Sequence, residues 1–179
     1  MAFSVDTFRS EMSGGGARPS LFDIKLTPPN WVGFPSSQFP FKAKASSIPA
    51  STIEAKEVSY FGHMVKFAGD RTFDDWTVTV YNDEDFAIRD AFERWLDGMD
   101  RHSQDGSVRG AAGTNPGSYV GDAVVRQYGK EGSVIKSYDF VNLWPSSIAE
   151  IAVDWDTTNE IETFDVTFKY DYYTARTTT

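Results

Sequence analysis

The sequence predicts a mainly β fold of antiparallel strands with one α-helix. Three observations lead to this prediction. Aromatic residues make up 15% of the chain, and aromatic side chains are enriched in β-strands. Segments in which apolar and polar residues alternate recur along the chain, and the short turns between them are typical of antiparallel pairing. One segment, residues 84–99, instead places apolar side chains at helical spacing.

Two strands are predicted in the first quarter of the chain. Residues 1–20 are polar, contain a glycine run and are expected to form a flexible N-terminal arm. Leu21–Thr27 alternates and is expected to form the first strand. Gln38–Ser46 is expected to form the second strand and to start at a sheet edge, because Pro40 has no amide hydrogen to donate.

The segment Ser51–Phe67 is open to two interpretations, either two strands or one strand and a loop. Gly69-Asp70-Arg71 is expected to form a turn into a strand at Trp76–Tyr81. The apolar face of that strand holds Trp76, Val78 and Val80.

The helix is predicted over Glu84–Met99. Asn82 or Asp83 is expected to cap it, and the acidic residues that follow favour the positive end of the helix dipole. Gly98 is expected to mark its end. The helix is expected to pack on the sheet through Ile88, Phe92, Trp95 and Leu96. The glycine-rich segment Arg101–Ser118 is expected to be a long loop, either mobile or ordered by a partner.

Four strands are predicted in the last third of the chain, before a polar tail at 174–179. They are Val120–Tyr128, Val134–Trp144, Ile148–Trp155 and Ile161–Tyr173, with a turn at Pro145-Ser146 between the second and third. Each of the last two has one apolar face, which is expected to be buried, and one wet face. In Ile148–Trp155 the apolar face comprises Ala149, Ile151, Val153 and Trp155.

The chain is acidic, with a net charge of −9 and a pI of about 4.6. Gripping nucleic acid requires Lys and Arg on phosphates, so this charge disfavours a nucleic-acid-binding protein, although the protein could surround DNA without holding it. Residues 1–66 have a charge balance of +2 and residues 67–179 a balance of −11, an asymmetry that is either incidental or suits a subunit whose ends meet head to tail. Between Asp139 and Asp171, eight acidic residues accompany a single base, Lys169. This region is either an ordinary solvated surface or a sheet face that repels a polyanion.

No catalytic, cofactor-binding or metal-binding residue is predicted, and we do not expect an enzyme. Cysteine is absent, which excludes disulfides and thiolate chemistry. His63 is interpreted as structural and His102 as exposed. Asp74 and Asp75 would point to opposite faces of a strand, so they would not share an ion. With no apolar run of signal-peptide or membrane-helix length, the chain is expected to be soluble and made in a cytoplasm.

The tryptophans are interpreted mainly as core residues. Trp76, Trp95 and Trp155 lie on apolar faces, which favours packing over sugar or base binding, whereas Trp144 is open to either interpretation.

Two stretches carry more specific information. The first is Ala68-Gly69-Asp70-Arg71-Thr72-Phe73-Asp74-Asp75-Trp76 with Asn82-Asp83-Glu84, and the second runs from Leu143-Trp144-Pro145 through Asp154-Trp155-Asp156 to Thr163-Phe164-Asp165-Val166. Both resemble the tail tube protein family of contractile-tailed, T-even-type bacteriophages in order and spacing. The resemblance runs from about Arg18 to Tyr173 and departs at Pro28–Ser37 and Arg101–Ser118.

The resemblance implies a single domain over residues 21–173 that forms a β-barrel or sandwich with one flanking helix, similar to the tube protein of type VI secretion. It implies homo-hexameric rings that stack into a tube inside a contractile sheath. The implied partners are the tail sheath protein, baseplate and tail terminator proteins, and the tape measure protein and genomic DNA in the lumen, without specific binding. The implied location is the virion, after assembly in the host cytoplasm.

An acidic bore would keep DNA mobile, and we expect Glu150, Asp154, Asp165 and Asp171 to line it. Ring-to-ring contacts are expected from Lys42, Lys44, Lys56, Asp70 and Arg71. Three alternatives remain open at this point. They are a tube of another contractile injection system that carries protein cargo, a monomeric β-sandwich carbohydrate-binding module with exposed tryptophans, and a hydrolase that uses acid pairs.

Overall fold

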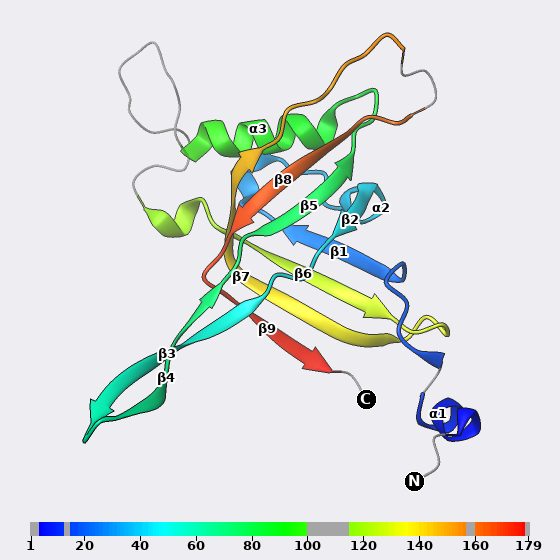
Figure 1. The fold of residues 1–179 in the computed structure, drawn as a ribbon. Helices are drawn as coiled ribbons and strands as arrows, with labels where there is room; N and C mark the ends of the chain where they lie inside the picture. Colours follow the sequence, from blue (N-terminus) through cyan, green and yellow to red (C-terminus); the bar gives the residue numbers. More distant parts are fainter. Residues whose placement is uncertain (1–3, 13–14, 100–114, 157–159, 178–179) are drawn as a thin grey trace.

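The computed structural model describes residues 4–12, 15–99, 115–156 and 160–177, and its main feature is a curved seven-stranded antiparallel sheet (Figure 1). The strand order is β1-β6-β7-β8-β5-β2, and β9 also pairs with β7. The strands are β1 (Phe22–Thr27), β2 (Ala43–Ser46), β5 (Trp76–Tyr81), β6 (Gly121–Tyr128), β7 (Val134–Ile148), β8 (Thr163–Lys169) and β9 (Tyr172–Thr177). The predicted mainly β fold is confirmed.

The long strand β7 joins the two parts of this sheet. Its first part pairs with β6 on one edge and with β9 on the other, and its last part pairs with β8. The short helix α2 (Phe39–Lys42) contacts both β1 and β2, the two ends of the strand order. The sheet therefore curls into an open barrel with α2 across the opening.

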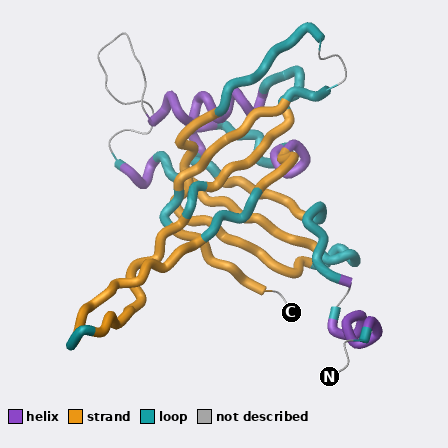
Figure 2. Tube along the Cα trace, in the orientation of Figure 1, coloured by secondary structure: helices purple, strands orange, loops and turns teal. Residues whose placement is uncertain are grey.

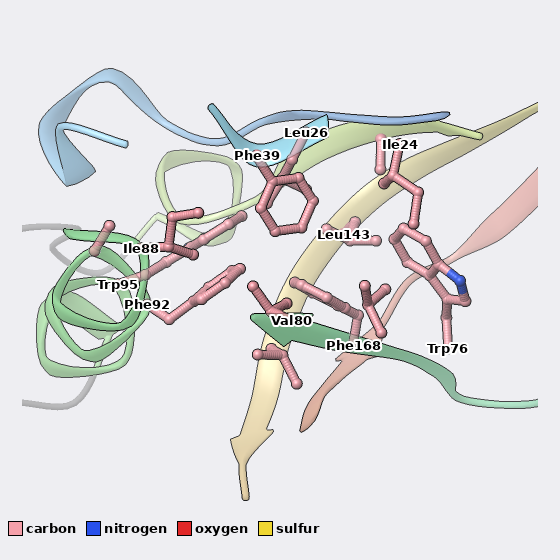
Figure 3. Packing of buried hydrophobic residues seen from close by; sticks show 14 of the residues in the cluster. Ile24, Leu26, Phe39, Trp76, Val80, Ile88, Phe92, Trp95, Leu143 and Phe168 are labelled. Atoms are coloured by element: carbon pink, nitrogen blue, oxygen red, sulfur yellow. The ribbon is translucent and has the colours of Figure 1, made fainter. Parts of the chain in front are cut away.

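The core fills the inside of this curl. Trp76 of β5 stacks on Phe140 of β7, with ring centroids 4.5 Å apart, and both side chains are buried. Figure 3 shows α3 (Ala87–Met99) contributing Ile88, Phe92 and Trp95 to the same cluster. These three side chains are buried, and Leu96 is half-buried. Burial of such a face is the main source of stability for a helix in a protein.

A second sheet stands apart from the barrel. It is a hairpin of β3 (Ser51–Tyr60) and β4 (His63–Phe73), which pair only with each other. Figure 2 shows it extending away from the other strands. Of the two interpretations of Ser51–Phe67, the two-strand one is therefore right. The remaining described elements are the helix α1 (Val5–Glu11) and two short 3-10 helices, η2 (Asn30–Val32) and η3 (Pro116–Ser118).

The strand predicted over Gln38–Ser46 is wrong in its first half, which forms α2. Proline at the first turn of a helix loses no hydrogen bond, so Pro40 starts this turn of helix and does not mark a sheet edge. Phe39 is fully buried and Phe41 is 87% exposed. The apparent alternation came from a short helix and a four-residue strand in succession.

The helix α3 begins three residues later than predicted, and its expected caps are engaged elsewhere. Phe86 has a φ of 51°, which is incompatible with continued helix, and the Asp85 carboxylate accepts a hydrogen bond from the Ala87 amide (3.2 Å). Asn82 donates to Glu162 (2.8 Å), and Asp83 forms an ion pair with Lys42. Gly98, the predicted end, lies inside the last turn.

The turn at Pro145-Ser146 and the strand Ile148–Trp155 are also wrong. β7 continues through Pro145 to Ile148, and its register with β8 shifts between Pro145 and Ser147. Proline, which has no amide hydrogen, is tolerated in a strand at such an irregularity. After the Ala149 amide donates to the Asp165 carbonyl (2.8 Å), the chain leaves the sheet. Trp155, expected in the core, is 100% exposed in the single chain.

The strand predicted over Ile161–Tyr173 is divided into β8 and β9, and both pair with β7. The interruption lies at Asp171, whose amide donates to Val141 and whose carboxylate accepts from Asn142 (2.6 Å). Side-chain alternation shifts there, so Tyr172 is exposed and Tyr173 is half-buried.

The turn expected at Gly69-Asp70-Arg71 lies within β4, next to a shift in register with β3. A Cβ at Gly69 would come within 2.6 Å of the Glu54 carbonyl oxygen. The glycine is therefore required by close approach of the two backbones.

Candidate functional site

The titratable side chains singled out in the sequence do not come together among the described residues. No group of three or more His, Asp or Glu side chains among them is placed to hold a metal ion. His63 is exposed next to the turn of the hairpin, and His102 lies outside the described residues. The Asp75 carboxylate pairs with Lys169 (2.7 Å), while the Asp74 carbonyl accepts the Tyr170 hydroxyl (2.7 Å). Burial of Tyr170 raises its pKa to about 12. No described helix has the length and apolarity to cross a membrane.

The most conspicuous surface is the β3–β4 hairpin. Every residue of β3 is exposed, and all but two residues of β4 are exposed. Because side chains alternate and the register pairs Val58 with Val65, one face gathers four large side chains. This apolar hairpin face consists of Val58, Tyr60, Val65 and Phe67, which are 52%, 67%, 41% and 56% exposed. Nothing among the described residues covers it.

The hairpin turn carries an aromatic residue in a strained conformation. Phe61 and Gly62 join the paired residues Tyr60 and His63, with φ values of 48° and 77°. A two-residue turn of this kind prefers Asn-Gly, since a left-handed φ costs an ordinary residue roughly 1–2 kcal/mol. The Phe61 ring is 85% exposed and touches only its neighbour Tyr60 among the described aromatic rings. Strained backbone conformations cluster at functional sites, which makes Phe61 a candidate contact residue.

The four acidic residues predicted to line a bore lie at separate places. Asp165 is on the solvent side of β8, where its carboxylate accepts the Thr79 hydroxyl (2.6 Å). Glu150 directly follows Ala149, whose amide donates a hydrogen bond to the Asp165 carbonyl. Glu150 and Asp165 are therefore neighbours in the structure. Asp154 lies further along the same connection, and Asp171 lies at the β8–β9 bend. They do not share one sheet face, because the strand expected at 148–155 does not form.

The five residues predicted for ring-to-ring contacts divide between the barrel and the hairpin. Lys42 binds Asp83 within the chain, and its hydrogen bond lowers the pKa of the Asp83 carboxyl. The Lys44 ammonium lies 5.4 Å from the centre of the Tyr81 ring. Lys56 and Asp70 pair with each other across the hairpin (3.2 Å). Arg71, also on the hairpin, forms no ion pair with another described residue.

These exposed surfaces suit a protein that assembles with other protein chains. A comparison with protein families shows to which family it belongs. The family model described as phage tail tube protein matches residues 17–176. The chain belongs to the phage tail tube protein family. This membership rules out the carbohydrate-binding module as an interpretation, although the exposed Trp155 is a feature that such a module would share.

Relatives from several phages support the tail tube assignment over the whole chain. The tail tube protein gp19 of Enterobacteria phage T4 is 38% identical over 172 residues, which are 96% of this chain and 99% of that protein. The phage T6 protein matches to the same extent. The tail tube protein of Serratia phage KSP90 is 23% identical and covers 93% of this chain and 94% of its own.

Solved structures show the same fold at low identity. The cap of the anti-feeding prophage matches with a TM-score of 0.64 and 18% identity, over 91% of this tail tube chain and 92% of its own. A chain of the sheath-tube complex of the extracellular contractile injection system PVC matches with a TM-score of 0.61 and 14% identity. The match covers 99% of this chain and 100% of that one. The predicted tube-like β fold is confirmed by these neighbours.

Two candidate contact residues of this tail tube protein are missed by reasoning from sequence. Trp155 lies on a segment that alternates like a strand, so the pattern placed it in the core. Phe61 precedes a glycine between two alternating segments, and an aromatic in that position is a weak signal without the backbone angles. Both residues are exposed in the single chain.

Proposed function

We propose that six copies of this tail tube protein close into a ring, that rings stack into a hollow tube inside a contractile sheath, and that genomic DNA passes through the bore during ejection. The proposal goes beyond family membership because it specifies the number of copies in a ring, the stacking of rings into a tube and DNA as the cargo. The 38% identity to tail tube proteins of phages T4 and T6 favours DNA as cargo over the protein cargo of an injection-system tube.

The single observation that carries the proposal is the exposed β3–β4 hairpin. An isolated two-stranded hairpin is marginally stable in water at best, and this one also presents an apolar face and a strained aromatic tip. Contact with another copy would bury the apolar face and give the exposed Phe61 ring a partner. In a ring, every copy gives its hairpin to one neighbour and receives the hairpin of the other, which is a head-to-tail contact that closes.

Unpaired strand edges support the same arrangement. β1, β2 and β9 each pair along one edge only among the described strands. Five of the six residues of β9 are exposed. Open edges are an aggregation hazard for a monomer, whereas a closed ring pairs or covers them against identical edges on its neighbours.

Charge supports stacking with one polarity. The segment 149–162 holds five acidic residues and no lysine or arginine. Its described parts, 149–156 and 160–162, lie at the same end of the molecule as α3 (Figure 1). The opposite end holds α1, where Arg9 is accompanied by Asp6 and Glu11, and β9, where Arg176 pairs with Asp139 (3.0 Å), so this end is less acidic than the first. Stacked rings would bring unlike ends together. In that arrangement Lys44 and Arg71 are our first candidates for meeting acidic groups of the next ring, and Lys56 would have to exchange its partner Asp70 to do so.

For the bore we propose the solvent side of β8, with Asp165 and the adjoining Glu150, and with Asp154 and Asp171 near its ends. DNA carries about one charge per 1.7 Å of its axis, and like charge acts over roughly 8 Å at physiological salt. An acidic wall would therefore keep DNA centred and free to move.

The remaining parts of the proposal concern partners and place. The PVC neighbours are described as a sheath-tube complex and a sheath/tube terminator, and we infer a sheath protein, a terminator and a baseplate as partners here. A tape measure protein and DNA would occupy the bore without specific binding. We infer a structural, non-enzymatic role in the virion after assembly in the host cytoplasm.

The experiment is removal of the hairpin. Residues 52–72 are replaced by an Asn-Gly turn that joins the paired residues Ser51 and Phe73. No hairpin residue belongs to the buried core, so circular dichroism should report a folded protein. Sedimentation velocity should report rings or tubes for the wild type and monomers for the deletion. A control that keeps the hairpin but replaces the exposed pair Glu57 and Lys66 with serine should still assemble. Equal assembly of the deletion variant, or a monomeric wild type at all concentrations, would refute the proposal.

A further inference from the structure

The N-terminal helix α1 has an apolar side that is largely uncovered by the other described residues. Val5, Phe8 and Met12 recur at helical spacing and are 68%, 65% and 44% exposed. The side-chain hydrogen bonds at Ser4 and Ser10 stay within the segment. Isolated helices shorter than about 12 residues are marginal in water. A seven-residue helix therefore needs another surface against its apolar side in order to persist.

The apolar hairpin face is the matching surface. The hairpin too is only marginally stable without cover, and its four large side chains lie on one face of the two-stranded ribbon. At its base it carries Lys56 on one strand and Asp70 on the other. The apolar side of α1 is flanked by Glu11 on one edge and Arg9 on the other. Each surface thus combines an apolar centre with one charge of each sign.

Within a single chain the two surfaces lie on opposite sides. α1 precedes β1, at one edge of the β1-β6-β7-β9 array. The hairpin base lies at the other edge, where the Phe73 ring contacts Tyr173 of β9, with centroids 5.3 Å apart. Three strand spacings of about 4.8 Å separate these edges, and Figure 1 shows α1 and the hairpin tip pointing apart. In copies placed side by side, the β1 edge of one faces the β9 edge of the next.

We propose that α1 of one copy docks through Val5, Phe8 and Met12 on the apolar hairpin face of the adjacent copy in the ring. The roughly ten residues between α1 and β1 can span at most about 35 Å, enough to reach a neighbour. This contact is far below the area of a standard interface, so it adds to the edge contacts and depends on the proposed ring.

The absence of cysteine from the sequence allows a direct test by disulfide cross-linking. A Phe8→Cys protein is mixed with Val58→Cys, Val65→Cys or Phe67→Cys protein under assembly conditions and then oxidised. A disulfide requires Cβ atoms within about 4.5 Å, so at least one pair should give a covalent dimer on a non-reducing gel. Two controls move one cysteine to the opposite side of its element, Thr7→Cys on α1 and Lys66→Cys on the hairpin, and these should give no dimer above background.

Each outcome has a clear meaning. A dimer from the mixed single-cysteine proteins, absent from the controls, supports the docking. Equal yield from the controls, or no dimer from any pair, overturns it. A Phe8→Cys/Val65→Cys protein that only closes a bridge within one chain overturns the assignment to a second copy. Tubes that form normally without any cross-link would refute this contact and leave the proposed tube intact, whereas absence of tubes would count against the proposed function itself.

Discussion

Gly98 of α3 lies directly against the indole ring of Trp31, so closely that a Cβ at residue 98 would overlap the six-membered part of the ring. Trp31 is fixed in place from its other end, because its indole N–H donates to the Ser118 carbonyl (2.8 Å). The glycine therefore serves packing between α3 and the η2 segment, although it lies where a helix-terminating glycine is expected.

Substitution Gly98→Ala should lower the free energy of unfolding by about 1–3 kcal/mol, the usual range for overpacking. Alanine is a better helix former than glycine by roughly 1 kcal/mol, which would stabilise the protein. The sign of the change in unfolding free energy therefore shows whether overpacking or helix propensity dominates. Urea unfolding measures it. The neighbouring Asp97→Ala, on the exposed side of α3, should cost nothing. The smaller, acyclic side chain of Trp31→Leu should remove the penalty of Gly98→Ala. A more stable Gly98→Ala protein in the wild-type background would contradict the packing account.

Substitution Phe61→Asn should relieve strain at the hairpin turn while weakening assembly. The new turn would be Asn-Gly, which suits two left-handed residues, and the gain should be about 1 kcal/mol. Hydrogen exchange of the hairpin amides measures the first effect, and the critical concentration for assembly measures the second. Gly62→Ala is the matched control, since its Cβ meets no atom and only the φ of 77° is strained. If Phe61→Asn assembles as well as the wild type, Phe61 is no contact residue.

The ion pair between Lys42 and Asp83 should make part of the stability depend on pH. The pKa of Asp83 is lowered by its hydrogen bond from Lys42, so the stabilisation is present above the ordinary carboxyl pKa of 3.8 and is lost as pH falls through the lowered value. Lys42→Met should therefore destabilise the protein at pH 7, and its difference from the wild type should shrink below about pH 4. Unfolding curves at several pH values give this difference, and a gap that stays constant down to pH 2 would show that the pair does not contribute.

Strand positions with their own hydrophobic alternation were predictable from the sequence. Trp76–Tyr81 is a strand with Trp76, Val78 and Val80 buried, as the pattern indicated. Alternation reports the two faces of a strand that has a core on one side, so it failed where apolar side chains are exposed in the single chain. Trp155 is the clearest case, because its neighbours alternate and yet the segment leaves the sheet.

Local sequence also does not reveal contacts between distant segments. The sequence predicts Lys42 as a ring-to-ring contact, but within the chain its ammonium pairs with Asp83, which lies 41 residues later. The four acidic residues expected to line the bore lie on the polar faces of two predicted strands, 148–155 and 161–173. Only Asp165 occupies such a strand in the structure, because chain pairing, and not alternation, decides where β7 ends.

Charge reversal on the proposed bore should slow DNA passage without preventing assembly. Asp165→Lys and Glu150→Lys each replace a negative charge with a positive one where we place the wall, and attraction to phosphates should delay ejection several-fold at low salt. The rate of DNA release from phage carrying the variant measures this. Asp90→Lys on the exposed side of α3 is the charge-matched control and should leave the rate unchanged. Unaltered release by both bore variants would place these residues elsewhere.

Electron microscopy of the protein purified alone and concentrated would test the central claim most directly, since it shows whether copies associate and what shape results. We predict sixfold rings and stacked tubes with an open centre, in which hairpins are covered by neighbouring copies and carboxylates face the channel. Single globular particles at every concentration, or a channel wall dominated by lysine and arginine, would contradict the account.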